Sequence, residues 1–261
     1  MQRDDPSTNT PIPVGDQMIQ HTIHSDRTFE GRACGIACTT GGSLLLAALL
    51  SACASPPPPP APVEPVVDIE QRAFVTEVAT ELDGPVRVVF DWSAREVGGS
   101  RLSGAGVTRA EPPYRARLDL FLDNNEAVAQ AALVGGDLRL PRGARRELLP
   151  PPHLLWGTLG VFRPGVDQTL LGGDVSEGTL RIRYRLADAS EIHYEVRAGR
   201  VLGVERLVGG SVVQRVELEY GDEERIPARA VYRDLAEGRE LVITRTTLEH
   251  VEPFPPDIWG P

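Results

Sequence analysis

Lysine is absent from this chain of 261 residues, so all 27 of its basic side chains are arginine. The 37 acidic side chains outnumber them, and the formal net charge is −10. An acidic chain without a clustered basic stripe lacks the charge that neutralises phosphates, so we exclude nucleic acid as a partner. The absence of lysine also excludes a phosphate-binding loop of the G-x-x-x-x-G-K-[ST] type, and the sequence contains no G-x-S-x-G nucleophile motif.

Cysteine is almost as scarce. Cys34, Cys38 and Cys53 are the three cysteines, so the chain beyond them can contain neither a disulfide nor a thiolate metal site. Cys34 and Cys38 have no second cysteine pair and no nearby histidine pair to complete a zinc site. We therefore expect no metal and no cofactor in the folded part of the protein.

Residue patterns typical of catalysis are also missing. The histidines beyond Cys53 are His153, His193 and His250, and none has a partner at metal-ligand spacing. We expect His193 to be solvated on the polar face of a strand, and Glu217 and Glu219 to lie on the surface. Residues 172–174 (Gly-Gly-Asp) resemble a nucleotide-cyclase signature in letters only, and we interpret them as a turn. The sequence thus predicts no catalytic residue and no enzymatic activity.

Long hydrophobic runs are absent too. The seven apolar residues from Leu44 to Leu50 are too few to cross a hydrocarbon core, which needs about 20 helical residues. They are typical of the apolar region of a signal peptide, which we place at residues 31–52. Residues 1–30 are polar and irregular, so we expect them to be disordered or an over-extended gene start, with Met18 as an alternative initiator.

The residues at the end of this run have a specific pattern. Leu50, Ser51, Ala52 and Cys53 resemble the lipobox of bacterial lipoproteins. The resemblance implies cleavage between Ala52 and Cys53, a diacylated Cys53 thiol and, commonly, an acylated new amino terminus. A buried helix with an incidental cysteine is the alternative, but the five prolines at residues 56–60 argue against it, because proline cannot continue a helix.

The expected lipid groups define a location. Two or three acyl chains give a stable membrane anchor, whereas one chain binds only marginally. Ala54 stands where an aspartate would, by the same resemblance, be read as retention in the inner membrane. We therefore expect the protein to be anchored in the outer membrane and to face the periplasm, with the acyl groups on Cys53 as its covalent modification.

The chain after the anchor begins with a tether. Residues 53–67 are rich in proline and predict an extended, semi-rigid linker. A helix follows, because Asp68 and Gln71 have the spacing of a capping box and an apolar face recurs at helical spacing up to Gly84-Pro85. That face contains Phe74, Val75, Val78 and Leu82.

Beyond the helix, the hydrophobic period changes from helical to two. Apolar and polar residues alternate over many short segments, and short glycine-containing turns join neighbouring segments as hairpins. We expect strands over residues 86–91, 100–110, 114–123, 126–134, 180–186, 192–196, 200–208, 211–220, 226–234 and 239–250. The fold class is therefore mainly β, a curved antiparallel sheet with one dry face and one wet face.

One apolar segment interrupts the strands. Residues 150–162 (PPPHLLWGTLGVF) predict a short helix that begins at proline. Such a helix has to bury its apolar residues against another element. We expect it to act as a lid at the mouth or on the concave face of the curved sheet.

This order of elements resembles a known superfamily. Its features here are Phe90-Asp91-Trp92, the glycine-rich strand at residues 102–106 and the run from Pro112 to Phe121, all within residues 68–252. Together they resemble the lipoprotein-localisation carriers and receptors, LolA and LolB. The resemblance implies an unclosed β-barrel whose helices cover a cavity for acyl chains, followed here by a proline-rich tail at residues 253–261.

If that fold is correct, we expect six apolar residues to line the cavity. They are Trp92, Leu118, Leu120, Leu155, Trp156 and Phe162. The alternative is that they form a sealed core, since apolar residues on an inward face need no ligand to explain them. Two functions stay open: a lipoprotein that binds an acyl chain or a lipidated protein, and a non-enzymatic envelope module that binds a protein partner through its charged sheet face.

Overall fold

The structure is a computed structural model that describes residues 62–96, 98–165, 167–222 and 224–260. The expected signal peptide, the lipobox from Leu50 to Cys53 and most of the tether lie outside these residues. Within them, no helix is long and apolar enough to cross a membrane.

The described chain contains thirteen strands and two α-helices, with two short 3-10 segments. In chain order the elements are β1 (Glu64–Pro65), α1 (Ile69–Thr80), β2 (Val86–Arg95), β3 (Arg101–Glu111), β4 (Arg115–Leu122), β5 (Ala127–Val134), β6 (Asp137–Arg139), η1 (Arg146–Leu148), α2 (Pro152–Thr158), β7 (Thr169–Ser176), β8 (Thr179–Arg185), β9 (Glu191–Arg197), β10 (Arg200–Val208), β11 (Ser211–Glu219), β12 (Arg229–Asp234), β13 (Arg239–His250) and η2 (Pro256–Trp259).

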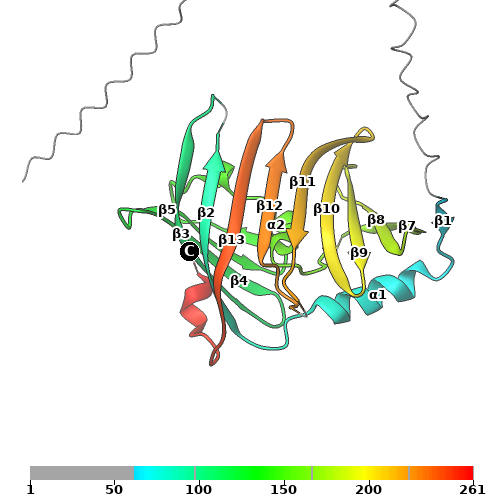
Figure 1. Cartoon of the computed structure of the whole chain (residues 1–261), viewed down its shortest axis with the longest axis horizontal. Coiled ribbons are helices and arrows are strands. Elements are labelled where there is room, and N and C mark those ends of the chain that lie inside the picture. The colour runs from blue at the N-terminus through cyan, green and yellow to red at the C-terminus, as the bar shows by residue number, and fades with distance from the viewer. Residues whose placement is uncertain (1–61, 97, 166, 223, 261) are drawn as a thin grey trace, which may run out of the picture. The chain divides into compact units, whose positions relative to one another are not determined.

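All thirteen strands form one antiparallel sheet, which confirms the predicted fold class. Their order is β1-β7-β8-β9-β10-β11-β12-β13-β2-β3-β4-β5-β6; the edge strands β1 and β6 do not pair with each other, so the sheet does not close. Figure 1 shows the sheet curving around α2, while α1 runs across the lower ends of β9 and β10. The strand β6 lies at one edge of the sheet, and β7 lies next to the other edge, so the connection between them crosses the sheet. The helix α2 belongs to this connection and lies on the concave side of the sheet.

The alternation of apolar and polar residues along the strands determines which face of the sheet is buried. On β2, the buried residues Val86, Val88, Phe90 and Trp92 alternate with exposed or half-buried neighbours. The same alternation brings Ile192, Tyr194 and Val196 of β9 into the core. The concave face is therefore apolar, as predicted.

Two local predictions were wrong. Asp68 makes no side-chain hydrogen bond at the start of α1, so the capping box does not form. Residues 172–174 are not a turn but the middle of β7, where Gly173 pairs with Ile182 after a register shift. A Cβ on Gly173 would lie well under 3.0 Å from the Ile69 side chain, so this glycine allows the start of α1 to approach the sheet closely.

Both ends of the described chain are fixed to the sheet. Glu64 and Pro65, within the expected tether, pair with Val175 and Asp174 of β7. At the other end Trp259 is buried, and its carbonyl oxygen accepts a hydrogen bond of 3.1 Å from Nη1 of Arg139. The residues of the expected C-terminal tail thus pack against β4 and β5.

Candidate hydrophobic-ligand site

The short helix α2 fills the concave side of the sheet. It begins with proline, and Leu154, Leu155 and Trp156 are all buried. It ends in a Schellman arrangement, because the Val161 N–H donates to the Trp156 carbonyl (3.1 Å) and the Gly160 N–H donates to the Gly157 carbonyl (2.8 Å). Gly160 has a φ of 75°, which favours glycine there. The predicted lid helix is confirmed as an inserted helix.

Trp156 connects α2 to the far half of the sheet. Its indole Nε1 donates a hydrogen bond of 2.6 Å to the carbonyl oxygen of Gly135, in the turn between β5 and β6. Its ring also packs edge-on against Tyr114, with centroids 5.9 Å apart. On its other side, α2 packs against β10, β11 and β12. The helix therefore bridges two parts of the sheet that no strand pairing joins directly.

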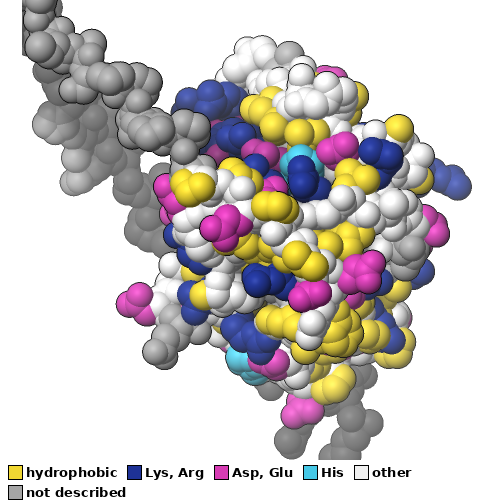
Figure 2. Space-filling model, turned by 90° about the vertical axis from the view of Figure 1, so that its right-hand side faces the viewer, with side chains coloured by type: hydrophobic (Ala, Val, Ile, Leu, Met, Phe, Trp, Pro, Cys, Tyr) yellow, Lys and Arg dark blue, Asp and Glu magenta, His cyan; other side chains and the backbone are white. Residues whose placement is uncertain are grey.

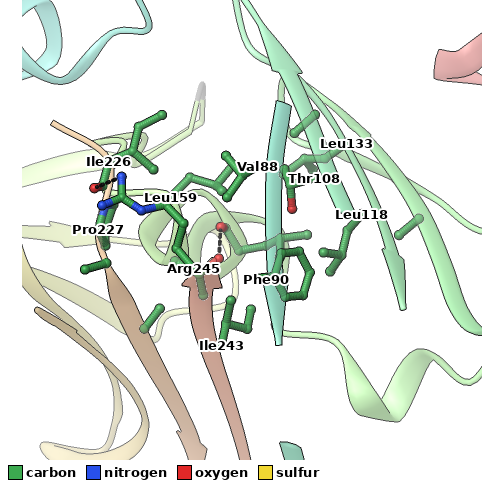
Figure 3. A pocket seen from close by; sticks show the side chains of 16 residues that line it. Val88, Phe90, Thr108, Leu118, Leu133, Leu159, Ile226, Pro227, Ile243 and Arg245 are labelled. Carbon is green, nitrogen blue, oxygen red and sulfur yellow. Dashed lines mark hydrogen bonds between the residues drawn. The ribbon is translucent and has the colours of Figure 1, made fainter. Parts of the chain in front are cut away.

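A small apolar cavity remains between α2 and the sheet. It has a volume of about 30 Å³, about the space of one water molecule. Figure 3 shows Val88, Phe90 and Leu118 on one side of this inner cavity and Ile226 and Ile243 on the other. The interior of the closed protein is therefore nearly filled.

A larger hollow lies outside the inner cavity. This vestibule has a volume of about 430 Å³ and is lined by the end of α1, the β9–β10 turn, residues 224–226 and the end of β13. Leu159 and Ile226 line both the vestibule and the inner cavity. These two side chains thus form a neck between the solvent-facing hollow and the apolar interior.

A nearly buried arginine holds the neck in place. The side chain of Arg245 is only 10% exposed and lines the inner cavity. Its Nη1 donates to the Ile226 carbonyl at 3.3 Å (Figure 3). Its Nη2 donates to the carboxylate of Glu224. Both partners belong to the vestibule wall, so this one guanidinium fixes the segment that carries Ile226.

The six predicted cavity residues are all buried, but they do not all lie in one place. Leu118 and Leu155 line the inner cavity. The other four, Trp92, Leu120, Trp156 and Phe162, lie in the core outside its lining. Their contact with a ligand stays a prediction.

Leu159, Ile226 and Arg245 were not predicted as site residues. Leu159 and Ile226 fall within the predicted helix and a predicted strand, but the structure ends α2 at Thr158 and begins β12 at Arg229. Both residues therefore lie in connecting segments, where the period of the element does not indicate which side chains point inward.

Trp92 has a structural role that its sequence position did not reveal. Its indole Nε1 donates to the carbonyl oxygens of Ala105 and Phe121, both at 3.0 Å. Trp92 pairs across the sheet with Gly104, which has no side chain to occupy the space of the ring. The glycine-rich strand β3 therefore accommodates the large rings of β2.

The three histidines in the described part of the chain do not form a metal site. His153, at the start of α2, has a buried Nε2 without a hydrogen-bond partner among the described residues. Burial, and then the charge of Arg206, lower its pKa to about 4 although Asp188 acts in the opposite direction, so His153 is neutral at pH 7. His193 is less solvated than predicted: its side chain is 14% exposed and its Nε2 lies 3.0 Å from the Glu191 carboxylate. No group of three metal-ligating side chains occurs within the described ranges.

The wet face of the sheet carries ion pairs between neighbouring strands. Arg233 contacts both Glu217 (2.6 Å) and Glu240 (2.9 Å), and Arg215 contacts Glu205 (2.6 Å). Exposed pairs of this kind contribute about 0–1 kcal/mol each. Because these charges already satisfy one another, they offer little unpaired charge to a protein partner.

The arrangement can be compared with known proteins. A scan against models of protein families found no match, and a search of curated proteins found none. Among solved structures, a LolA superfamily protein from Nitrosomonas europaea aligns with a TM-score of 0.52 at 12% identity, over 73% of this chain and 97% of that one. The chain has a LolA-like fold.

Two further structures align with this LolA-like domain. One is a domain from Vibrio parahaemolyticus named for outer membrane lipoprotein sorting, with a TM-score of 0.46, 10% identity, and coverage of 74% of this chain and 94% of that one. The other is a DUF1329 family protein from Desulfovibrio piger, with a TM-score of 0.47, 12% identity, and coverage of 75% and 97%. At these identities the comparisons describe the fold, and the function has to be argued from the site.

Proposed function

We propose that this protein is a lipoprotein, anchored through Cys53 in the outer membrane and facing the periplasm, whose LolA-like domain binds a hydrophobic ligand. The ligand would be an acyl chain or the lipidated end of another protein. The observation that carries the proposal is the vestibule of about 430 Å³ that adjoins the apolar interior through a neck of two side chains.

The binding step would begin in the vestibule. The tip of an acyl chain would displace Leu159 and Ile226 and then separate α2 from the sheet. Each methylene group that leaves water contributes about 0.8 kcal/mol, which offsets the lost packing of α2. The seven-residue α2 is a suitable moving part, because it belongs to no sheet and begins after Pro150 and Pro151.

The test measures binding of a long-chain fluorescent fatty acid to the chain from residue 53 onward, carrying Cys53→Ser. We expect saturable binding by this chain. Ile226→Trp should weaken it by about tenfold or more, because the larger ring fills the neck.

The matched control is Leu235→Trp, which places the same ring at a side chain that is 51% exposed and outside both hollows. This variant should bind as the parent does. Undiminished binding by Ile226→Trp would place the ligand elsewhere, and absence of binding by the parent would contradict the proposal.

The filled interior favours a second candidate, an envelope interaction module with a protein partner and no small ligand. Its supporting observation is the inner cavity of only about 30 Å³. This alternative predicts no fatty-acid binding by the parent chain and a specific partner in whole-cell cross-linking.

The anchor has its own prediction. Cys53→Ser should produce an uncleaved precursor that takes up no labelled palmitate, because the thiol is the expected acyl acceptor. Cys38→Ser is the control and should mature normally. Normal cleavage of the Cys53→Ser precursor, seen as an unchanged mature band on a gel, would contradict the lipoprotein assignment.

A further inference from the structure

Helix α1 leaves most of its apolar face exposed, although Val75 also borders an open hollow between α1 and the strands β8 and β9. Phe74, Val75 and Val78 are 66%, 57% and 55% exposed, whereas its buried residues are the small Ala73 and Thr76. At 100° per residue, the three exposed side chains occupy an arc of about 100° on the side opposite to the sheet. We call these three residues the apolar stripe.

Packing inside the described domain does not explain the apolar stripe. α1 contacts the sheet through its other face, where Ile69 approaches Gly173 and the Thr80 hydroxyl accepts a hydrogen bond of 2.9 Å from the Phe162 N–H. Figure 2 views the side of the molecule on which α1 begins, and hydrophobic side chains are spread over this face between single charged ones. A helix whose apolar residues lie outward indicates a surface that is covered by something else.

The size of the apolar stripe favours a lipid surface over a protein. A stable protein interface buries about 800 Å² and 20–30 residues on each partner, far more than three side chains of one helix. A bilayer needs no matching shape, and an amphipathic helix inserts only the depth of its apolar side chains. Val63 and Val67, which precede α1, are also 60% and 94% exposed and extend the apolar surface toward the expected anchor.

The length of chain before α1 supports the same occupant. Eight residues separate Cys53 from the first described residue, Pro62, and the nine steps between them allow a span of about 28 Å if this stretch is extended. A tether of this length keeps α1 at a high local concentration beside the bilayer, so even weak insertion would persist.

The charges around the apolar stripe specify the kind of lipid. Glu70, Glu77 and Glu81 follow one of its sides, and Arg72 follows the other. Glu77 is paired with Arg163, but the border remains acidic in total. An acidic border is repelled by anionic lipids, so the surface fits a zwitterionic bilayer.

We propose that the apolar stripe of α1 lies in the interface of the zwitterionic bilayer to which the chain is anchored. The proposal rests on the anchor at Cys53. The vestibule is lined by Ala79, Thr80, Glu81 and Leu82, which follow the apolar stripe directly, so its opening would lie beside the lipid. This placement would let an acyl chain pass between the bilayer and the neck with little exposure to water.

The experiment uses the purified lipidated protein, reconstituted into phosphatidylcholine vesicles. The expected cleavage before Cys53 removes Cys34 and Cys38, and acylation blocks the Cys53 thiol, so a new cysteine is labelled alone. An environment-sensitive fluorophore is attached at Val78→Cys or, as the matched control, at Val208→Cys. These valines are 55% and 50% exposed, but Val208 lies at the end of β10. We expect the probe at residue 78 to shift its emission to shorter wavelength and to be quenched by brominated lipid, while the probe at residue 208 stays accessible to iodide.

Flotation of the vesicles tests the anchor at Cys53 separately from the placement of the apolar stripe in the bilayer. Protein that does not float with vesicles overturns the anchor, and the placement of the apolar stripe with it. Protein that floats with both probes equally accessible to iodide overturns the placement alone. The probe at residue 78 could also be shielded in whole cells but not in vesicles that contain no other protein. That result would overturn the placement of the apolar stripe in lipid and would indicate a protein partner.

Discussion

Trp156→Ala is expected to lower the free energy of unfolding by about 3–5 kcal/mol. Trp156 is 1% exposed and is the largest side chain of α2. Its removal would leave a cavity between α2 and the sheet, and it would also leave the Gly135 carbonyl without the indole donor. Because α2 bridges strands that do not pair, no ladder hydrogen bonds compensate for this loss.

Urea denaturation of the parent and the variant measures the effect. Trp156→Phe is the matched control: it keeps an aromatic ring but removes the donor, so we expect a smaller loss of about 1–2 kcal/mol. Equal stability of Trp156→Ala and the parent would mean that α2 is not held as the structure indicates.

The same variant separates the two candidate functions. If α2 has to move before a ligand enters, a loosened α2 should take up fluorescent fatty acid faster than the parent does, although the protein is less stable. A filled-core module would lose stability without gaining any uptake. Stopped-flow mixing under conditions where both proteins are folded distinguishes these outcomes.

The elements of the fold were predictable where the sequence has a single clear pattern of apolar residues. Strict alternation identified β2 and β9, and the proline-led apolar run identified α2. β7 was missed because Gly172 and Gly173 interrupt the alternation, and glycine there serves the close approach of α1 and a register shift. A single sequence cannot distinguish that use of glycine from a turn.

The site was less predictable than the fold, for a geometric reason. Five separate segments line the vestibule, and each contributes only a few residues. Ile226 lies at the neck, where Arg245, nineteen positions later in the sequence, holds its carbonyl. For α1 the periodicity identified an apolar face correctly, but its orientation depended on small residues that fit against the sheet. Ala73 and Thr76 pack there, and the larger side chains lie outward.

The second large effect is expected at a glycine. Gly104→Ala should lower the free energy of unfolding by about 3 kcal/mol or more, because overpacking of a core costs about 1–3 kcal/mol even where side chains can move. Here the obstacle is backbone: a Cβ on Gly104 would lie well under 3.0 Å from the Phe121 carbonyl oxygen on β4. That oxygen also accepts the hydrogen bond from Trp92, so a shift of β4 would disturb the packed indole as well.

Two other glycines make the prediction specific. At Gly106 the nearest obstacle is the ring of Phe90, a side chain, and the nearest backbone atom, the Asp119 carbonyl oxygen, is 3.0 Å away, so Gly106→Ala should cost less than Gly104→Ala. At Gly84 no atom lies within 4 Å of an added Cβ, and alanine there should change stability by no more than about 1 kcal/mol. Urea denaturation of the three variants should therefore rank them Gly104, Gly106, Gly84 in order of decreasing loss. Equal losses at Gly104 and Gly84 would mean that β3 and β4 are not in the register observed, and the packing of Trp92 over Gly104 would then have to be abandoned.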